Sequence, residues 1–246
     1  MIEIYTKDQQ AYGEFNQGDI IENKPIGFPM DGGSLTSYSN IFYWAHAVAK
    51  KDSTIGLHPH KGFEIITFVL EGIIKHYDTL LKKWITLKKG DVQVIKAGSG
   101  ISHSEALNKD SAVFQIWFDP DLNTSLSQNA EYQDYNVNAL YHNDNKKYLI
   151  GNKSPIKINT ESIEIYEIEY KKEKIEIALD QNKYYSLYIL SGKVEIDTRE
   201  ISEDSFIKIY KEKNLIIQGN HKAKIFCIES PLEVSYKTYI ETIKKR

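Results

Sequence analysis

The segment FEIITFVLEG, residues 63–72, decides how the chain folds. It is rich in β-branched and aromatic residues and ends at Gly72, as expected of a strand that runs into a turn. Many short strands with few helical patterns predict an all-β barrel or sandwich. Similar short segments, separated by Gly, Asp, Asn and Lys, cover residues 73–79, 82–100, 112–119, 163–170, 174–179, 184–198, 205–210 and 224–230.

Two stretches lack the strand pattern. Residues 121–136, DLNTSLSQNAEYQDYN, are polar and have no strong period, so we interpret them as a connector with a helical turn. Residues 22–40, ENKPIGFPMDGGSLTSYSN, contain two prolines and paired glycines, which predict an ordered loop. A loop of that length is often functional.

The chain contains a weak internal sequence repeat. ITFVLEGIIKHYDT (66–79) resembles SLYILSGKVEIDT (186–198), with Gly72 aligned to Gly192. Two hairpins can resemble each other by chance, but a repeat of this length favours two copies of one β domain. We expect a first domain over residues 1–138 and a second over residues 139–246.

Composition narrows the class of protein. The chain has 246 residues, 41% of them apolar, and a net charge of −3, with no basic block that would predict direct nucleic-acid binding. A single cysteine, Cys227, excludes an internal disulfide framework. The polar N-terminus is unlike a signal peptide, and no apolar run approaches the roughly 20 residues that cross a bilayer. We therefore expect a soluble, cytoplasmic protein without a membrane partner.

A pair of histidines opens the strand region. In GLHPHKGFEI, residues 56–65, His58 and His60 are two residues apart, so in an extended backbone both side chains point to one side. Pro59 cannot donate to a sheet ladder, which places the pair at a rim or edge.

A second pair follows in KAGSGISHSEAL, residues 96–107. His103 and Glu105 again share a face, and Gly98 and Gly100 permit a tight turn before them. Three imidazoles and a carboxylate would suit iron, manganese, nickel, copper or zinc. A lone H-x-H is usually a pair of ordinary surface histidines. The clustering favours a metal site, but spacing alone leaves both interpretations open.

These residues carry a resemblance to a known family. HPHKGFEIITFVLEG (58–72), KKGDVQVIKAGSGISHSE (88–105) and FQIWFDP (114–120) together resemble the pirin family of the cupin superfamily. The resemblance covers about residues 20–135, and the C-terminal half resembles the family only in outline. It implies two tandem cupin (jelly-roll) β-barrels, with one metal in the first. The metal ligands that it implies are His58, His60, His103 and Glu105.

The resemblance also implies possible activities. Some pirins cleave the flavonol quercetin with dioxygen, releasing carbon monoxide, and others are described as nuclear, iron-binding regulators. We predict an oxygenase of the quercetin 2,3-dioxygenase type in which Glu105 is also the proton acceptor. We expect one divalent metal, Fe(II) first, with Mn, Ni, Cu and Zn as alternatives. The rivals are a non-catalytic, metal-dependent or redox-sensing module with a protein partner, and a different cupin activity on a small molecule. We expect a monomer.

Three further residues are candidates for supporting roles. Glu64 lies an even number of residues after His58 and His60, and we expect it to orient a ligand histidine. Gln115 could contact oxygen or substrate, or satisfy a backbone group. His76 could point into the barrel, but we favour a hydrogen bond in the core.

The second copy lacks a ligand set. The alignment of Gly72 with Gly192 is a shift of 120 residues between the two copies. With this shift, Ala178 and Asp180 occupy the positions that correspond to His58 and His60. A shift of 113 residues, which aligns Asp91 with Asp204, places Ile216 and Gln218 at the positions that correspond to His103 and Glu105. We therefore predict that the second domain binds no metal, and we interpret the isolated His221 as a surface residue.

Overall fold

The computed structural model describes residues 1–136, 142–143, 145–171, 174–219 and 221–243. The chain divides into two compact units. Gln10–Ala139 with Tyr236–Arg246 form what we call the first barrel, and Met1–Gln9 with Leu140–Ser235 form the second barrel. Each barrel thus takes a terminal segment from the opposite end of the chain. The boundary expected near residue 138 lies outside the described residues.

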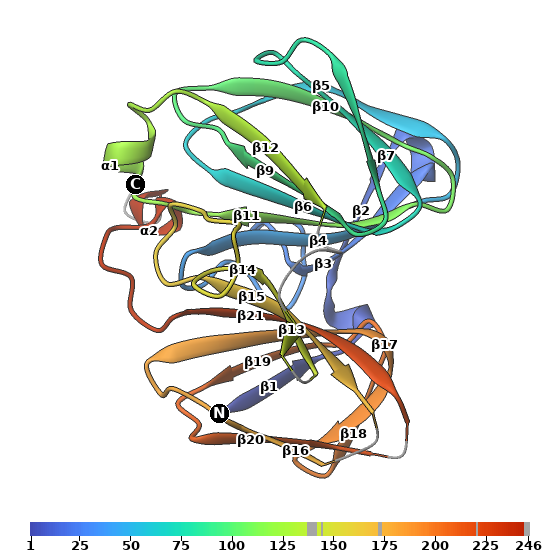
Figure 1. Cartoon of the computed structure of the whole chain (residues 1–246), viewed down its shortest axis with the longest axis vertical. Coiled ribbons are helices and arrows are strands. Elements are labelled where there is room, and N and C mark those ends of the chain that lie inside the picture. Colours follow the sequence, from blue (N-terminus) through green and yellow to red (C-terminus); the bar gives the residue numbers. More distant parts are fainter. Residues whose placement is uncertain (137–141, 144, 172–173, 220, 244–246) are drawn as a thin grey trace. The chain divides into compact units, whose positions relative to one another are not determined.

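The first barrel consists of two antiparallel sheets (Figure 1). One has the strand order β12-β9-β6-β11-β4-β3-β2 and the other β5-β10-β7-β8. Its elements are β2 (Ala11–Phe15), η2 (Asn16–Gly18), β3 (Ile20–Ile26), β4 (Ile41–Ala49), β5 (Ser53–His60), β6 (Glu64–Glu71), β7 (Ile73–Asp78), β8 (Trp84–Lys88), β9 (Asp91–Lys96), β10 (Ile101–Leu107), β11 (Ala112–Phe118), α1 (Leu122–Ser125), β12 (Glu131–Asn136) and α2 (Tyr239–Ile243).

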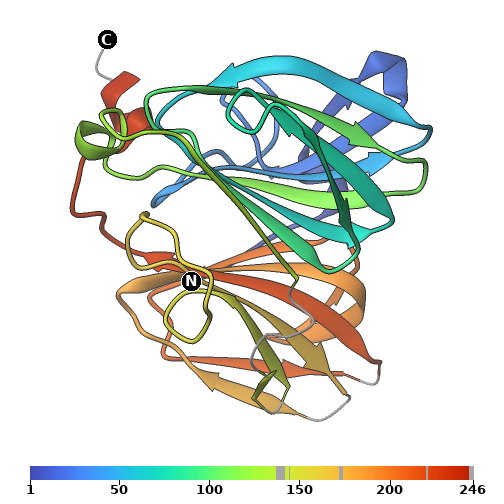
Figure 2. The same cartoon turned by 45° about the horizontal axis from the view of Figure 1, so that its top comes forward.

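The second barrel has the main strand order β1-β19-β17-β21-β15-β14-β13. Strands β18 and β20 pair with the far part of β17, and β16 pairs with β20, which folds the sheet back over itself (Figure 2). Its elements are β1 (Ile2–Tyr5), η1 (Lys7–Gln9), β13 (His142–Asn143), β14 (Lys146–Ile150), β15 (Glu164–Tyr170), β16 (Ile175–Ala178), β17 (Lys183–Ile196), β18 (Arg199–Ser202), β19 (Phe206–Tyr210), β20 (Asn214–Gln218) and β21 (Ala223–Pro231).

The segment FEIITFVLEG contributes β6, a central strand of the first barrel. Ile65, Ile66, Phe68 and Val69 of β6 are all buried, so both faces of this strand are covered and its sequence is a continuous apolar run. Burial of these side chains supplies the driving force for closing the sheets. The expected all-β architecture of two barrels is confirmed.

The two aligned glycines have the same backbone conformation. Gly72, between β6 and β7, has φ +74°, and Gly192, within β17, has φ +76°. This left-handed conformation is available to glycine at little steric cost, and at both positions the chain passes from one set of strand partners to another. The sequence repeat therefore corresponds to a glycine with positive φ, at which the strand partners change, in each barrel.

Two sequence interpretations need correction. Residues 121–136 contain the expected helical turn, α1, but residues 131–136 form β12, which pairs with β9. β12 lies at the edge of its sheet and is largely exposed, so its polar sequence hid a strand. Likewise, residues 22–26 belong to β3 and are not loop.

No helix among the described residues is long and apolar enough to cross a membrane. The helix α2 instead closes one end of the first barrel. Its Tyr239 ring contacts Phe42 and Phe63, and its Tyr239 N–H donates to Asp119 Oδ2 over 2.5 Å. Asp119 is only 2% exposed, and burial raises its pKa to about 7. The carboxyl of Asp119 is thus held largely protonated in the folded chain below that pH.

This raised pKa predicts a pH-dependent stability. An unfolded Asp119 loses its proton near pH 3.8, while the folded one keeps it to about pH 7. The stabilisation is therefore present below pH 3.8 and lost as the pH rises to about 7. We expect Asp119→Asn, which stays neutral, to remove this component from the free energy of unfolding measured by chemical denaturation between pH 4 and 8. Identical pH profiles for the two proteins would contradict this.

Candidate metal centre

Pairing of β5 with β10 brings the two histidine segments together. His103 lies opposite His58, and Ile101 lies opposite His60. Between His103 and Glu105 the register shifts, because β5 has two residues, Gly56 and Leu57, where β10 has one. Such a bulge bends the strand and changes the direction of the side chains beside it.

The three imidazoles form one cluster. Their ring centroids are separated by 4.8 Å (His58–His60), 4.5 Å (His58–His103) and 4.7 Å (His60–His103). One ring nitrogen of each lies within 4.8 Å of the other two, a spacing at which a single ion could bind all three. His60 and His103 are buried and His58 is half-buried.

The state of the ring nitrogens fits a metal. Nδ1 of His58 is 2.8 Å from the carbonyl oxygen of Gly56, and since only a protonated nitrogen can donate there, Nε2 carries the lone pair. Nε2 of His60 and both ring nitrogens of His103 are buried without a hydrogen-bond partner in the described part of the chain. Buried polar atoms without partners are costly, and a metal ion would satisfy one nitrogen of each ring.

Burial also keeps the rings of His60 and His103 uncharged. Desolvation, followed by the neighbouring histidines, lowers the pKa of His60 to about 3, and the same causes lower the pKa of His103 to about 3. Neutral imidazole is the form that binds metals. His60 and His103 can therefore bind a metal at neutral pH without first having to lose a proton.

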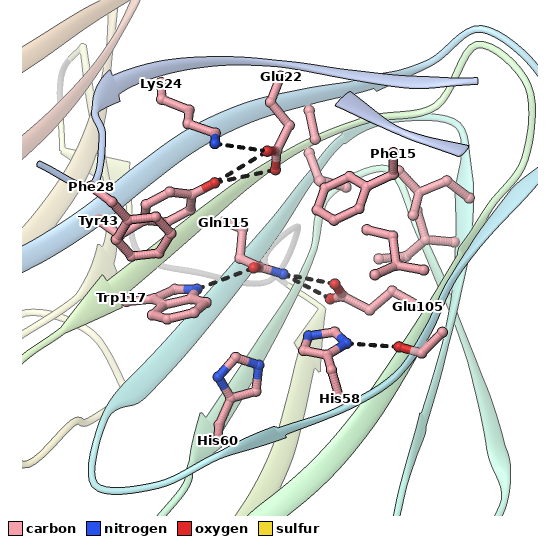
Figure 3. A pocket seen from close by; sticks show the side chains of 16 residues that line it. Phe15, Glu22, Lys24, Phe28, Tyr43, His58, His60, Glu105, Gln115 and Trp117 are labelled. Atoms are coloured by element: carbon pink, nitrogen blue, oxygen red, sulfur yellow. Dashed lines mark hydrogen bonds and ion pairs between the residues drawn. The ribbon is translucent and has the colours of Figure 1, made fainter. Parts of the chain in front are cut away.

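Glu105 is held by a short chain of hydrogen bonds. The indole N–H of Trp117 donates to Gln115 Oε1 over 3.1 Å, so the amide nitrogen of Gln115 must face the other way. That nitrogen donates to both oxygens of Glu105, over 3.0 and 2.8 Å (Figure 3). Gln115 thus lines the cavity and fixes the carboxylate.

A second group of possible donors shares His103. One donor atom each of His76, His103 and Glu105 lie within 4.8 Å of one another. His76 is fully buried, its Nε2 is 2.7 Å from Asp78 Oδ2, and its ring stacks on Tyr132. The hydrogen bond in the core that the sequence analysis favoured for His76 is present.

The remaining predicted residue lies apart from the cavity. Glu64 is 2% exposed at the start of β6, where it pairs in register with Lys96 and Phe118. It is absent from the described residues that line the cavity. In the second barrel, Ala178 and Gln218 end β16 and β20, and neither possible donor group within the described ranges includes a residue of that barrel.

A cavity of about 300 Å³ opens beside the imidazoles (Figure 3). Its size is at the lower end of the range for small-molecule sites. Most of its wall is apolar, and the polar groups are concentrated at two places. The lining residues are Phe15, Glu22, Lys24, Phe28, Tyr43, Ala47, Ile55, Gly56, His58, His60, Ile74, Glu105, Leu107, Val113, Gln115 and Trp117.

Sequence reasoning missed Glu22 and Lys24. Both lie on β3 and are buried on the same face as Ile20. The period-two alternation of these three residues is a signal for a strand, but Pro25 and the glycines that follow obscured it.

Comparison with known proteins agrees with this geometry. The family model described as Pirin matches residues 35–118. The quercetin 2,3-dioxygenase of Escherichia coli K12 is 26% identical over 183 residues, which are 72% of this chain and 76% of that protein. A pirin-like protein of Caulobacter vibrioides is 49% identical over 65 residues, 26% of this chain and 28% of its own. The crystal structure of the bacterial pirin YhhW of Escherichia coli in complex with nickel(II) superposes with TM-score 0.79 at 20% identity, covering 94% of this chain and 99% of that one.

The fold therefore defines a two-cupin protein whose first barrel carries a cluster of three imidazoles beside a cavity. Within that class, the first barrel is similar to proteins of the pirin family, whose model matches residues 35–118.

The turn before β10 offers a test of how the site is positioned. Gly98 has φ +52°, and a Cβ there would lie 2.6 Å from the carbonyl oxygen of Gln128 and 2.7 Å from that of Asn129. We expect Gly98→Ala to lower the free energy of unfolding by about 2 kcal/mol or more, since the backbone must shift. Gly56→Ala is the control, because a Cβ there meets nothing within 4 Å. Equal denaturation midpoints for the two variants would contradict this.

Proposed function

We propose that the chain is a metal-dependent oxygenase of the quercetin 2,3-dioxygenase type that acts on a flavonol-like aromatic substrate. The observation that carries the proposal is the cluster of His58, His60 and His103, two of which, His58 and His60, line a mostly apolar cavity. The names of relatives such as the quercetin 2,3-dioxygenase of Escherichia coli support the same class of reaction.

The proposed metal ligands are the three histidines together with Glu105. Fe(II) is our first choice, and this donor set also suits Mn, Ni, Cu or Zn. When bound, such a metal would supply Lewis acidity that lowers the pKa of a coordinated substrate hydroxyl, together with redox chemistry toward dioxygen. Each carboxylate oxygen of Glu105 accepts a hydrogen bond from Gln115, and since an ionised carboxylate can accept about four such bonds, lone pairs remain for a ligand role.

The protein supplies proton transfer and positioning. Glu105 lines the cavity, and we assign it the acceptance of the proton from the substrate hydroxyl. Gln115 and Trp117 hold it in place. The rings of Phe28 and Trp117, whose centroids are 5.7 Å apart, offer apolar surfaces to a flat aromatic substrate. The apolar wall excludes water from the reacting groups.

Metal content is the first test of the proposed ligands. We expect wild-type protein to contain close to one transition-metal ion per chain by elemental analysis. The double variant His58→Ala, His103→Ala should contain almost none, since half of the ligand set is gone. His221→Ala is the matched control, because that histidine is exposed in the second barrel. Retention of the metal by the double variant would exclude this site.

Turnover is tested by oxygen uptake with a flavonol. Glu105→Gln keeps the size of the side chain and removes its charge and basicity, so we expect uptake to fall by roughly 10²–10⁴-fold. Metal content measured on the same samples separates loss of the ligand from loss of the base. Full activity in Glu105→Gln would contradict the assigned role. A metal-loaded wild type that consumes no oxygen with any flavonol would contradict the oxygenase and favour a metal-dependent binding module.

A further inference from the structure

The cavity has a second polar region, formed by Glu22 and Lys24 of β3 and Tyr43 of β4. Figure 3 shows these side chains across the cavity from His58 and His60, with Gln115 between the two groups. All three are deeply buried, with exposed fractions of 6%, 9% and 4%. Charged side chains are seldom buried to this extent unless they are paired or functional.

The contacts leave Glu22 with the weakest set of partners. Lys24 Nζ is 3.1 Å from Asp31 Oδ2 but 3.6 Å from Glu22 Oε2. The hydroxyl of Tyr43 reaches both oxygens of Glu22 only at 3.3 Å, well beyond the usual length of an O–H···O bond. An ionised carboxylate can accept about four hydrogen bonds. Glu22 therefore keeps acceptor capacity on the wall of the cavity.

The backbone nearby makes room for this arrangement. Gly13 lies opposite Glu22 in the pairing of β2 with β3. A Cβ at Gly13 would lie 2.7 Å from Lys24 Nζ and 3.0 Å from Glu22 Oε2. A larger residue would displace both side chains, so a glycine here preserves the polar region.

The charges in this region favour a neutral hydrogen-bond donor over an acid. Glu22 and Asp31 carry two negative charges against the single positive charge of Lys24, and Glu105 adds another across the cavity. Burial, partly opposed by Lys24 and Tyr43, raises the pKa of Glu22. A substrate carboxylate would meet repulsion from Glu22, whereas a phenolic hydroxyl could donate to it.

We propose that Glu22 determines substrate specificity by accepting a hydrogen bond from a phenolic hydroxyl at the end of the substrate remote from the metal. The cavity then selects neutral, hydroxylated aromatic compounds over analogues that lack the hydroxyl and over aromatic acids. This inference rests on the proposed function for the position of the substrate, because it takes the other end of the molecule to lie at the imidazole cluster. Lys24 and Tyr43 act on the substrate through Glu22, as positioning residues.

The test measures binding without turnover. Metal-loaded protein is titrated anaerobically with four flavonols, and binding is followed by quenching of tryptophan fluorescence, since Trp117 lines the cavity. The first flavonol has an unsubstituted phenyl ring, the second and third carry one and two hydroxyls on that ring, and the fourth carries a carboxyl group there. For wild type we expect the hydroxylated compounds to bind about 10- to 100-fold more tightly than the unsubstituted one, and the acid most weakly.

Two substitutions of Glu22 separate its functions. Glu22→Leu removes the acceptor and should abolish the preference for hydroxylated compounds. Glu22→Gln keeps an acceptor but removes the charge, so it should weaken the rejection of the acid while keeping most of the hydroxyl preference. This milder variant keeps the test valid if Glu22→Leu does not fold. Glu14→Gln, on the exposed face of β2, is the control and should bind as wild type does.

The outcomes distinguish this inference from the proposed function. Equal affinities of wild type for all four flavonols, or a hydroxyl preference that survives in Glu22→Leu, would overturn the role of Glu22 even if oxygen uptake occurs. Graded binding that depends on Glu22 would support it even if no flavonol is consumed, in which case the oxygenase assignment alone fails.

Discussion

The register between β5 and β10 is the constraint on which the site depends. With His103 opposite His58, three imidazoles from two strands point into one space, and a shift of one residue would turn every second side chain to the other face. Burial keeps the rings of His60 and His103 neutral, and the carbonyl oxygen of Gly56 is within hydrogen-bond distance of Nδ1 of His58. Sheet pairing, desolvation and one backbone hydrogen bond thus produce a set of available lone pairs beside an apolar cavity.

The two barrels have the same fold but differ in the side chains that fill their interiors. Both bend the chain at a glycine with positive φ, at Gly72 and at Gly192. In the second barrel, the space enclosed by the sheets is filled by aliphatic and aromatic side chains such as Leu187, Ile189 and Tyr185, and Cys227 is buried among them. The second barrel is thus built around an apolar core, and the cavity beside the imidazoles belongs to the first barrel.

The sequence predicted much of this because the relevant signals are local. Apolar runs that end in glycine mark strands, and the spacing of His58 with His60 and of His103 with Glu105 places each pair on one face of a strand. The edge strand β12 and residues 22–26 of β3 were missed. β12 is polar because it is exposed, and β3 carries charged residues into a cavity, which contradicts the usual pattern of a buried face. The contacts of Gln115 with Glu105 and of Tyr43 with Glu22 join different strands, so no pattern within one strand could reveal them.

The central claim is that one metal ion binds at the three imidazoles of the first barrel. Anomalous diffraction from crystals of metal-loaded protein tests it most directly, since two possible donor groups share His103. Our account predicts one strong anomalous peak at roughly 2.0–2.2 Å from a ring nitrogen of each of His58, His60 and His103, with a carboxylate oxygen of Glu105 completing the protein ligands. A peak bound by His76 with Glu105 and away from His58 and His60, or no peak within the first barrel, would contradict it.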